Sequence, residues 1–256
     1  MPESVWSDVD DFFEQHLLPA DDVLRATLET NVAEGLPPIA VTPPQGKLLH
    51  LLARACNARR ILEIGTLGAY STIWMARALA PGGRLVTLEI DPHHAEVARR
   101  NLERARLTDR VEVRIGRAAD LLDAMKGVVE PFDFVFIDAD KASSDVYFQA
   151  TLELSHPGTV IVVDNVVRSG KVADGSSDDE DIQGIRRMTE WLATQPEISA
   201  TAIQTVGGKS YDGFLMAIVG GGDSVTQYYR TSAPPHFRTP ALTAARTSPH
   251  PQSPGC

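Results

Sequence analysis

Two largely apolar stretches of the chain end on oxygen-bearing side chains. Residues 132–137 run directly into Asp138, and residues 159–163 run into Asp164 and Asn165. Runs of this kind are typical of buried parallel strands, which deliver polar residues at their carboxyl ends. If the two strands are neighbours, carboxylate and amide oxygens meet at one point, and such oxygens suit Mg²⁺ rather than copper or zinc. We therefore predict a divalent-cation site, in preference to polar strand ends that only begin a loop.

A lysine lies next to this predicted site. Lys141 follows Asp138 by three residues, in the segment that leaves the same strand. It could be an ordinary surface lysine paired with Asp140 or Asp145. Near a bound cation, however, like-charge repulsion disfavours the ammonium form, which makes the neutral amine available as a base. We favour a catalytic role for Lys141.

A glycine-containing turn and an acidic residue predict a second binding function. Gly65 follows the apolar stretch 60–64 and precedes a predicted helix, where backbone can approach a cofactor closely. The turn is not the G-x-G-x-x-G of dinucleotide enzymes, because Leu67 occupies its third position. Glu89 ends the next predicted strand, where a carboxylate can accept hydrogen bonds from ribose hydroxyls. Together they indicate a nucleoside-type cofactor.

The elements that must position these residues alternate between strand and helix. Such alternation predicts an α/β fold with a doubly wound, mostly parallel sheet covered by helices on both faces. Two late strands are expected to form an antiparallel pair at the sheet edge, and extra amphipathic helices precede the core. The expected strands are 60–64, 84–90, 111–115, 132–137, 159–163, 198–206 and 213–219, and the expected helices are 9–33, 45–55, 70–79, 92–105, 118–125, 144–154 and 182–193.

Composition limits the class of protein. The 256 residues carry a formal net charge of -10, which disfavours a nucleic-acid groove, and no apolar run is long enough to span a membrane. The two cysteines suggest neither a disulfide framework nor a zinc site, and a cytoplasmic location fits best. We expect one domain over 1–220, with N-terminal helices in 9–56 and a core in 57–220, and a disordered tail over 221–256.

Several motifs together resemble a known family. They resemble the cation-dependent class I O-methyltransferases that use S-adenosylmethionine, typified by caffeoyl-CoA and catechol O-methyltransferases. The resemblance covers roughly residues 41–219 and implies a Rossmann-like fold. The motifs are Ile61-Leu-Glu-Ile-Gly-Thr66 with Tyr70-Ser71, Glu89-Ile-Asp91, Phe136-Ile-Asp-Ala-Asp-Lys141, Val163-Asp-Asn165 and Tyr211-Asp-Gly-Phe214.

The resemblance also implies roles for individual residues. Part of the set would bind S-adenosylmethionine, and the rest would bind the metal or take part in catalysis. The methionine part would be held by Val41, Glu63, Gly65, Thr66 and Ser71, the ribose by Glu89, the adenine beside Ala118, with Asp140 lining the same pocket; Asp138, Asp164 and Asn165 match the metal ligands, and Lys141 matches the catalytic lysine.

Some positions depart from the family pattern. Ala69 stands where a second glycine is frequent, so its methyl group could crowd the cofactor turn. Ser143 and Ser144 replace a frequent Asn and Tyr, and Arg168 stands where the plant enzymes carry Trp. The last three changes bear on the acceptor pocket.

These features predict a function with two alternatives. We expect Mg²⁺-dependent methyl transfer from S-adenosylmethionine to one hydroxyl of a small vicinal dihydroxy aromatic molecule. The acidic loop 174–181 and the N-terminal helices are expected to cover the acceptor and to join subunits, and the resemblance implies a homodimer. The alternatives are an NAD-dependent oxidoreductase, since Glu89 would also suit its ribose, and a non-catalytic cofactor-binding module that acts through partners.

Overall fold

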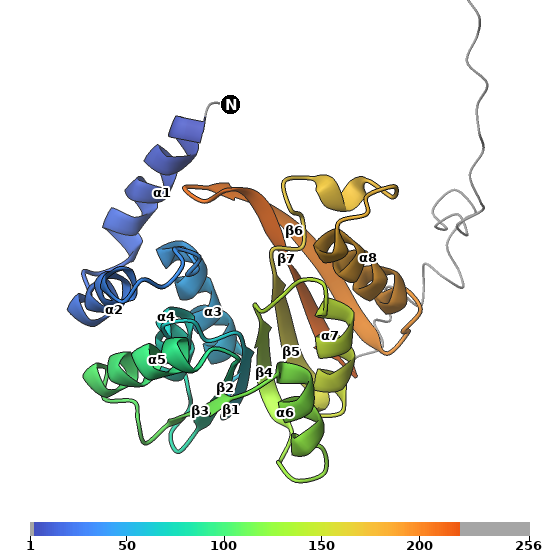
Figure 1. Ribbon diagram of the computed structural model, residues 1–256, viewed down its shortest axis with the longest axis horizontal. Helices are drawn as coiled ribbons and strands as arrows, with labels where there is room; N and C mark the ends of the chain where they lie inside the picture. The colour runs from blue at the N-terminus through green and yellow to red at the C-terminus, as the bar shows by residue number, and fades with distance from the viewer. Residues whose placement is uncertain (1–2, 221–256) are drawn as a thin grey trace, which may run out of the picture.

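The protein folds around one mixed seven-stranded sheet (Figure 1). The computed structural model describes residues 3–220, and the tail expected over 221–256 lies outside them. The strand order is β3-β2-β1-β4-β5-β7-β6; β1 to β5 are parallel, and β7 is antiparallel to both of its neighbours. The predicted fold class is confirmed. The strands are β1 (Arg60–Ile64), β2 (Arg84–Glu89), β3 (Val111–Ile115), β4 (Phe132–Ile137), β5 (Ser155–Asp164), β6 (Ile198–Gly207) and β7 (Ser210–Val219).

Helices cover both faces of the sheet. One face is covered by α3, α4 and α5, with α2 against α4 and α5, and the other by α6, α7 and α8 (Figure 1). Within residues 3–220, no helix combines the length and apolar character that crossing a membrane requires. The helices are α1 (Glu3–Leu17), α2 (Asp22–Ala33), α3 (Pro43–Ala55), α4 (Tyr70–Ala76), α5 (Pro92–Arg104), α6 (Ala118–Met125), α7 (Ser144–Leu152) and α8 (Glu180–Leu192), with a short 3₁₀ turn η1 (Lys171–Ala173).

Strand β4 illustrates why the central strands are continuously apolar. Phe134 and Phe136 pack into the core on the α3–α5 side, whereas Val135 and Ile137 pack into the core on the α6–α8 side. All four side chains are buried. Because helices cover both faces, alternate residues have no solvent-facing side to occupy, and the strand is apolar at nearly every position.

Some elements end at other residues than the sequence predicts. Helix α4 ends at Ala76. The next backbone hydrogen bonds run from the Ala78 N–H to the Met75 carbonyl and from the Leu79 N–H to the Ala76 carbonyl. Because they join residues only three apart, they tighten the chain into a turn. Strand β5 begins at Ser155, earlier than expected, and its pairing with β4 shifts in register near Phe132. A shift of this kind accommodates residues that break the regular strand pattern.

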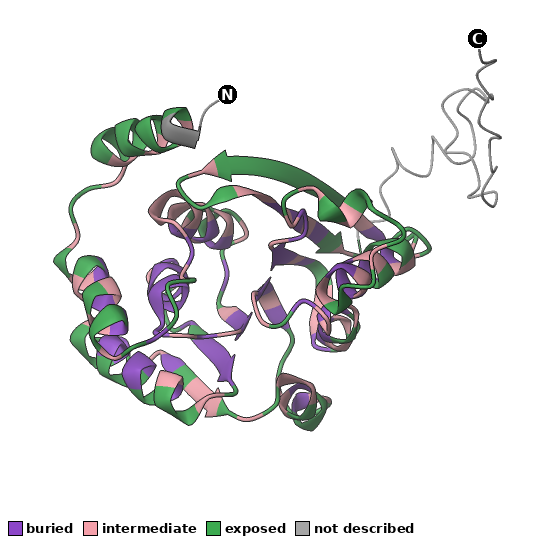
Figure 2. Cartoon of the chain, turned by 45° about the horizontal axis from the view of Figure 1, so that its top comes forward, coloured by how far each residue is buried: buried purple, intermediate pink, exposed green. Residues whose placement is uncertain are grey.

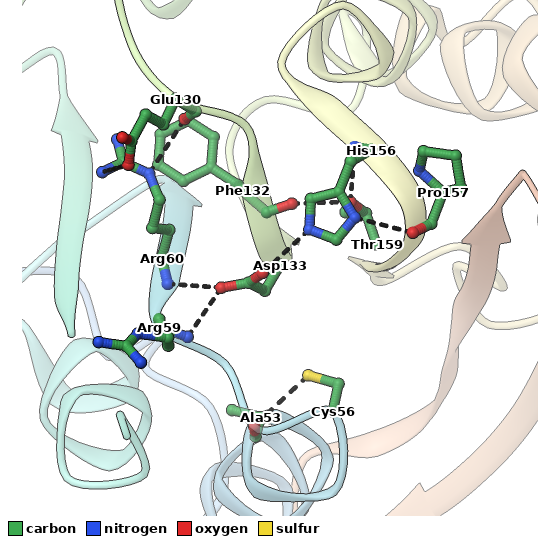
Figure 3. A network of polar contacts seen from close by, with 10 residues as sticks. All are labelled: Ala53, Cys56, Arg59, Arg60, Glu130, Phe132, Asp133, His156, Pro157 and Thr159. Atoms are coloured by element: carbon green, nitrogen blue, oxygen red, sulfur yellow. Dashed lines mark hydrogen bonds and ion pairs between the residues drawn. The ribbon is translucent and has the colours of Figure 1, made fainter. Parts of the chain in front are cut away.

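A polar network joins three strands at the amino edge of the sheet (Figure 3). The Asp133 Oδ2 atom accepts hydrogen bonds from the backbone N–H groups of Arg59 and Arg60, at 2.7 and 2.8 Å. Its Oδ1 atom lies 2.9 Å from His156 Nε2, and His156 Nδ1 lies 2.8 Å from the Pro157 carbonyl oxygen. Since both partners of the ring only accept hydrogen bonds, the imidazolium form, which donates from both nitrogens, satisfies this geometry.

Candidate active site

The carboxyl ends of β4 and β5 bring the predicted metal ligands together. Ile137 is paired with Val163 in the parallel ladder, so the residues that follow, Asp138 and Asp164, leave the sheet side by side. The loop after β1 approaches the same place. A Cβ atom on Gly65 would lie 2.2 Å from the Asp138 carbonyl oxygen, and the φ angle of Gly65 is +98°. Glycine is therefore required here by the contact with the chain after β4 as well as by the turn itself.

Lys141 is held directly against one of these carboxylates. Its Nζ atom donates to Asp138 Oδ1 at 2.7 Å, and the side chain is buried. A buried charged pair needs close geometry to offset the loss of hydration, and this distance provides it. The predicted catalytic lysine therefore lies beside the predicted ligand cluster.

Within residues 3–220, Asp164 forms no ion pair with a lysine or arginine. The residue is only 5% exposed. Burial, and then the charge of Asp138, raise its pKa to about 7, while Lys141 acts in the opposite direction. Two neighbouring carboxylates that share one ammonium group leave an excess of negative charge in a poorly hydrated place, which a hard cation would neutralise.

The donor set fits such a cation by its chemistry. Among residues 3–220, no group of three or more His, Cys, Asp or Glu side chains is arranged to hold a metal ion. The predicted set contains two carboxylates and the Asn165 amide, all of them oxygen donors of the kind that Mg²⁺ accepts. Asn165 adopts a φ of 55°, and its backbone N–H donates to Asp164 Oδ1 at 2.8 Å.

A cleft of about 520 Å³ opens beside Asp164 and Asn165. Val41, between α2 and α3, lines the same cleft, and so does Arg168. The predicted cofactor residue Val41 and two predicted metal ligands thus share one cavity. Its volume lies within the range of small-molecule sites.

Glu89 holds the turn after β1 in place by hydrogen bonds to its backbone. Its Oε2 atom accepts hydrogen bonds from the backbone N–H groups of Thr66 and Leu67, at 3.2 and 2.8 Å, and its Oε1 atom accepts from Asp91 N–H at 2.9 Å. A carboxylate has about four acceptor sites, so these contacts leave limited capacity for a ribose hydroxyl. The role predicted for Glu89 in ribose binding stays a prediction.

Behind the turn, Glu63 is the centre of a buried hydroxyl cluster. Its side chain is fully buried and accepts hydrogen bonds from Ser71 and Thr72, both at 2.5 Å, and from Thr87 at 2.7 Å. Burial raises the pKa of Glu63 to about 7, the three hydroxyl groups oppose this shift, and Asp138 adds to it. The Thr66 hydroxyl contacts that of Thr87 at 2.5 Å. Three predicted cofactor residues, Glu63, Thr66 and Ser71, are therefore linked within the protein.

The remaining predicted residues lie around the same edge of the sheet. Ala118 is the first residue of α6, after β3. Asp140 accepts hydrogen bonds from the Tyr147 hydroxyl at 2.5 Å and from the Ser143 N–H at 3.0 Å. Asp140 is thus tied to the start of α7, and Ser143, which departs from the family pattern, contributes to that contact.

The sequence singled out neither Asp10 nor Lys209 on the opposite wall of the cleft. Asp10 of α1 and Lys209 at the tip of the β6–β7 hairpin line it, together with Asp212 of the motif Tyr211-Asp-Gly-Phe214. Of the two segments expected to cover the acceptor, the N-terminal helices contribute Asp10, whereas residues 174–181 are not among the lining residues.

A family model described as O-methyltransferase matches residues 16–215. The chain belongs to the O-methyltransferase family. Catechol O-methyltransferase of Niastella koreensis is 49% identical over 220 residues, covering 86% of this chain and 100% of that protein. Catechol O-methyltransferase of Mycobacterium tuberculosis is 52% identical over 212 residues, covering 83% and 95%. The crystal structure of the O-methyltransferase from Bacillus cereus in complex with SAH has a TM-score of 0.84 and 54% identity, covering 85% and 100%.

The family assignment identifies this methyltransferase as an enzyme that uses S-adenosylmethionine. It excludes the NAD-dependent oxidoreductase considered as an alternative. It also decides against the non-catalytic binding module. The predicted family and cofactor are confirmed, and the acceptor and the metal are left to be proposed.

Proposed function

We propose that this chain is a divalent-cation-dependent O-methyltransferase that methylates one hydroxyl of a small vicinal dihydroxy aromatic molecule. The observation that carries the proposal is the placement of Asp138 and Asp164 side by side, with Asp164 and Asn165 lining a cleft of small-molecule size. Two relatives of about half-identical sequence bear the name catechol O-methyltransferase, which supports a diol acceptor.

The residues of the proposed site have different roles. When bound, S-adenosylmethionine supplies the methyl group and the cation supplies a Lewis acid that lowers the pKa of the acceptor hydroxyl. Asp138, Asp164 and Asn165 would hold the cation. Lys141, whose Nζ atom lies 2.7 Å from Asp138 Oδ1, would stabilise the deprotonated acceptor oxygen as an ammonium group, or take the acceptor proton as a neutral amine. The turn at Gly65 would orient the donor toward that oxygen, and such positioning contributes much of the rate.

Metal dependence provides the first test. We expect EDTA to abolish methylation of a catechol, measured by mass spectrometry, and Mg²⁺ to restore it. Asp164→Asn should lower kcat/KM by about 100-fold or more, because one charged ligand is lost. Asp123→Asn, the same change at an exposed position of α6, should leave the rate near the wild-type value.

A second measurement is independent of turnover. Mg²⁺ should raise the melting temperature of the wild-type protein and have no such effect on Asp164→Asn. Without metal, this variant should be at least as stable as wild type, because the amide removes a buried charge that faces Asp138. Full activity in EDTA, or an Asp164→Asn variant that Mg²⁺ still stabilises, contradicts the metal assignment.

We also propose that the enzyme is a homodimer. The support is the apolar surface of α1, on which Phe12 and Phe13 are exposed. The cytoplasmic location stays a prediction from composition.

A further inference from the structure

The tip of the β6–β7 hairpin forms a wall of the cleft that contains Asp164 and Asn165. Because β7 runs antiparallel to β5, the hairpin tip at residues 207–210 lies at the carboxyl edge of the parallel strands, where the site is. Helix α1 lies near the hairpin tip (Figure 1). The Asp10 Oδ2 atom accepts a hydrogen bond from the Gly208 N–H at 2.8 Å and so holds the tip in place. The tip is therefore a positioned part of the site.

The tip carries a lysine whose charge is not paired. The two cations that line the cleft are Lys209 and Arg168. Arg168 is engaged by Asp181 at 3.0 Å, whereas Lys209 makes no hydrogen bond or ion pair within residues 3–220. Lys209 as a residue is exposed, and partial burial lowers the pKa of its side chain against the opposing charges of Asp138 and Asp164. Lys209 and Asp164 line the same cleft, so the ammonium group and this carboxylate face one cavity.

The other carboxylates that line the cleft are occupied by backbone groups. Asp212 Oδ1 accepts the N–H groups of Val167, Arg168 and Gly213 at 2.9 to 3.0 Å, and Asp10 accepts that of Gly208. Within residues 3–220, neither carboxylate forms an ion pair with the Lys209 ammonium group. Once a cation neutralises Asp138 and Asp164, Lys209 is left as a positive charge with no protein counter-charge in contact.

We propose that Lys209 selects acceptors that carry a carboxylate on the aromatic ring, at the end away from the two hydroxyl groups. The inference rests on the function proposed above, which places the diol at Asp138, Asp164 and Asn165. With the diol held there, the rest of the ring occupies the cleft that Asp164, Asn165 and Lys209 line together. An anion at the far end of the ring would then meet the ammonium group of the hairpin tip.

Among anionic groups, a single carboxylate suits the lone Lys209 ammonium group of this wall better than a phosphate does. A phosphate group is usually held by several donors, often the planar fork of an arginine. The Arg168 guanidinium is already engaged by Asp181, which leaves one ammonium point charge. The cleft of about 520 Å³ also suits a small aromatic acid better than a large conjugate.

Two acceptors that differ in charge but little in size provide the test. These are 3,4-dihydroxybenzoate and 3,4-dihydroxybenzyl alcohol, each assayed with S-adenosylmethionine and Mg²⁺. For wild type, we expect kcat/KM to favour the acid. Lys209→Met should lower the acid-to-alcohol ratio of kcat/KM by about tenfold, mainly through KM of the acid, because one charge-assisted contact is lost. Lys209→Glu should lower it further, and Lys209→Arg should retain most of it.

A matched control separates a local contact from the overall charge. Lys171→Met removes the same charge from η1, which does not line the cleft, and should leave the ratio unchanged. Calorimetric binding of 3,4-dihydroxybenzoate, with SAH and Mg²⁺ present, should weaken by a similar factor in Lys209→Met. This second readout does not depend on turnover.

The outcomes distinguish this inference from the proposed function. If wild type methylates the alcohol but the acid-to-alcohol ratio is the same in wild type and Lys209→Met, the selection by Lys209 is wrong and the proposed function stands. If wild type methylates neither diol, the proposed function fails and the inference fails with it. Equal losses for Lys171→Met and Lys209→Met would also overturn it, since the effect would be one of net charge.

Discussion

Ala69 shows how a single residue can be held in a conformation that its type disfavours. It precedes α4 with a φ of 68° and a ψ of 25°, in the left-handed region, and its methyl group is fully buried. The methyl group expected to crowd the turn is accommodated. The unfavourable contribution comes instead from the backbone, because a left-handed conformation costs an L-residue about 1–2 kcal/mol.

Replacement of this alanine by glycine should therefore be nearly neutral. In Ala69→Gly, the relief of backbone strain offsets the lost methyl burial and the greater freedom of the unfolded chain. We expect the free energy of unfolding, measured in urea, to stay within about 0.5 kcal/mol of wild type. The control, Ala98→Gly in the buried interior of α5, should lose about 1.5–2 kcal/mol. Equal losses for both variants would show that position 69 carries no strain.

Sequence and structure agree on the polar residues that lie at the ends of the parallel strands. Asp138, Asp164 and Asn165 were predicted together because parallel strands end at one edge, and the structure places them there. Lys209 and Asp10 escaped prediction for a physical reason. The contact between Asp10 and Gly208 joins residues 198 positions apart, and no local pattern of residue types encodes such a contact.

The Asp133–His156 network links the beginnings of strands β1, β4 and β5, at the edge of the sheet away from the site. The expected strand 159–163 does not include His156, whereas β5 begins at Ser155 and contains it. The contacts to Pro157 and Asp133 raise the pKa of His156. A group whose pKa is raised by folding stabilises the protein at pH values below its unfolded pKa of 6.5, and this contribution disappears as the pH rises through the folded pKa.

The pH dependence of stability tests this network. The difference in free energy of unfolding between wild type and His156→Gln should be largest near pH 5.5 and should decline toward pH 9. Its size should be roughly 0.5 kcal/mol, because the ring is partly exposed. A difference that grows with pH would contradict the assignment of an imidazolium.

For the whole molecule, the unusual surface is that of α1. Helix α1 lies alongside the outer part of β6, and both are largely exposed (Figure 2). Phe12 and Phe13 are 56% and 48% exposed, and the same helix exposes Val5, Val9 and Leu17. Apolar side chains gathered in this way on an exposed helix are typical of an interface. A second copy of the chain would cover them, in agreement with the proposed homodimer.

Charge placed on this helix should separate the subunits. Analytical ultracentrifugation should give twice the chain mass for wild type, and the chain mass for Phe12→Glu/Phe13→Glu, because burial of two carboxylates in an interface is unfavourable. Val32→Glu, at an exposed apolar position of α2, should remain dimeric. Circular dichroism should show that all variants keep the fold. A monomeric wild type would refute the homodimer.

The reversal of strand direction at β7 has a consequence for how this enzyme can change. The residues proposed to bind the donor lie at the ends of β1, β2 and β4, so they are constrained by the central sheet. The proposed acceptor wall, by contrast, includes a continuous stretch of a few residues at the end of an edge hairpin. We expect that this stretch can be exchanged without disturbing the central strands. Diversification of acceptor range, in nature or by design, therefore has a short and separable target in residues 207–210.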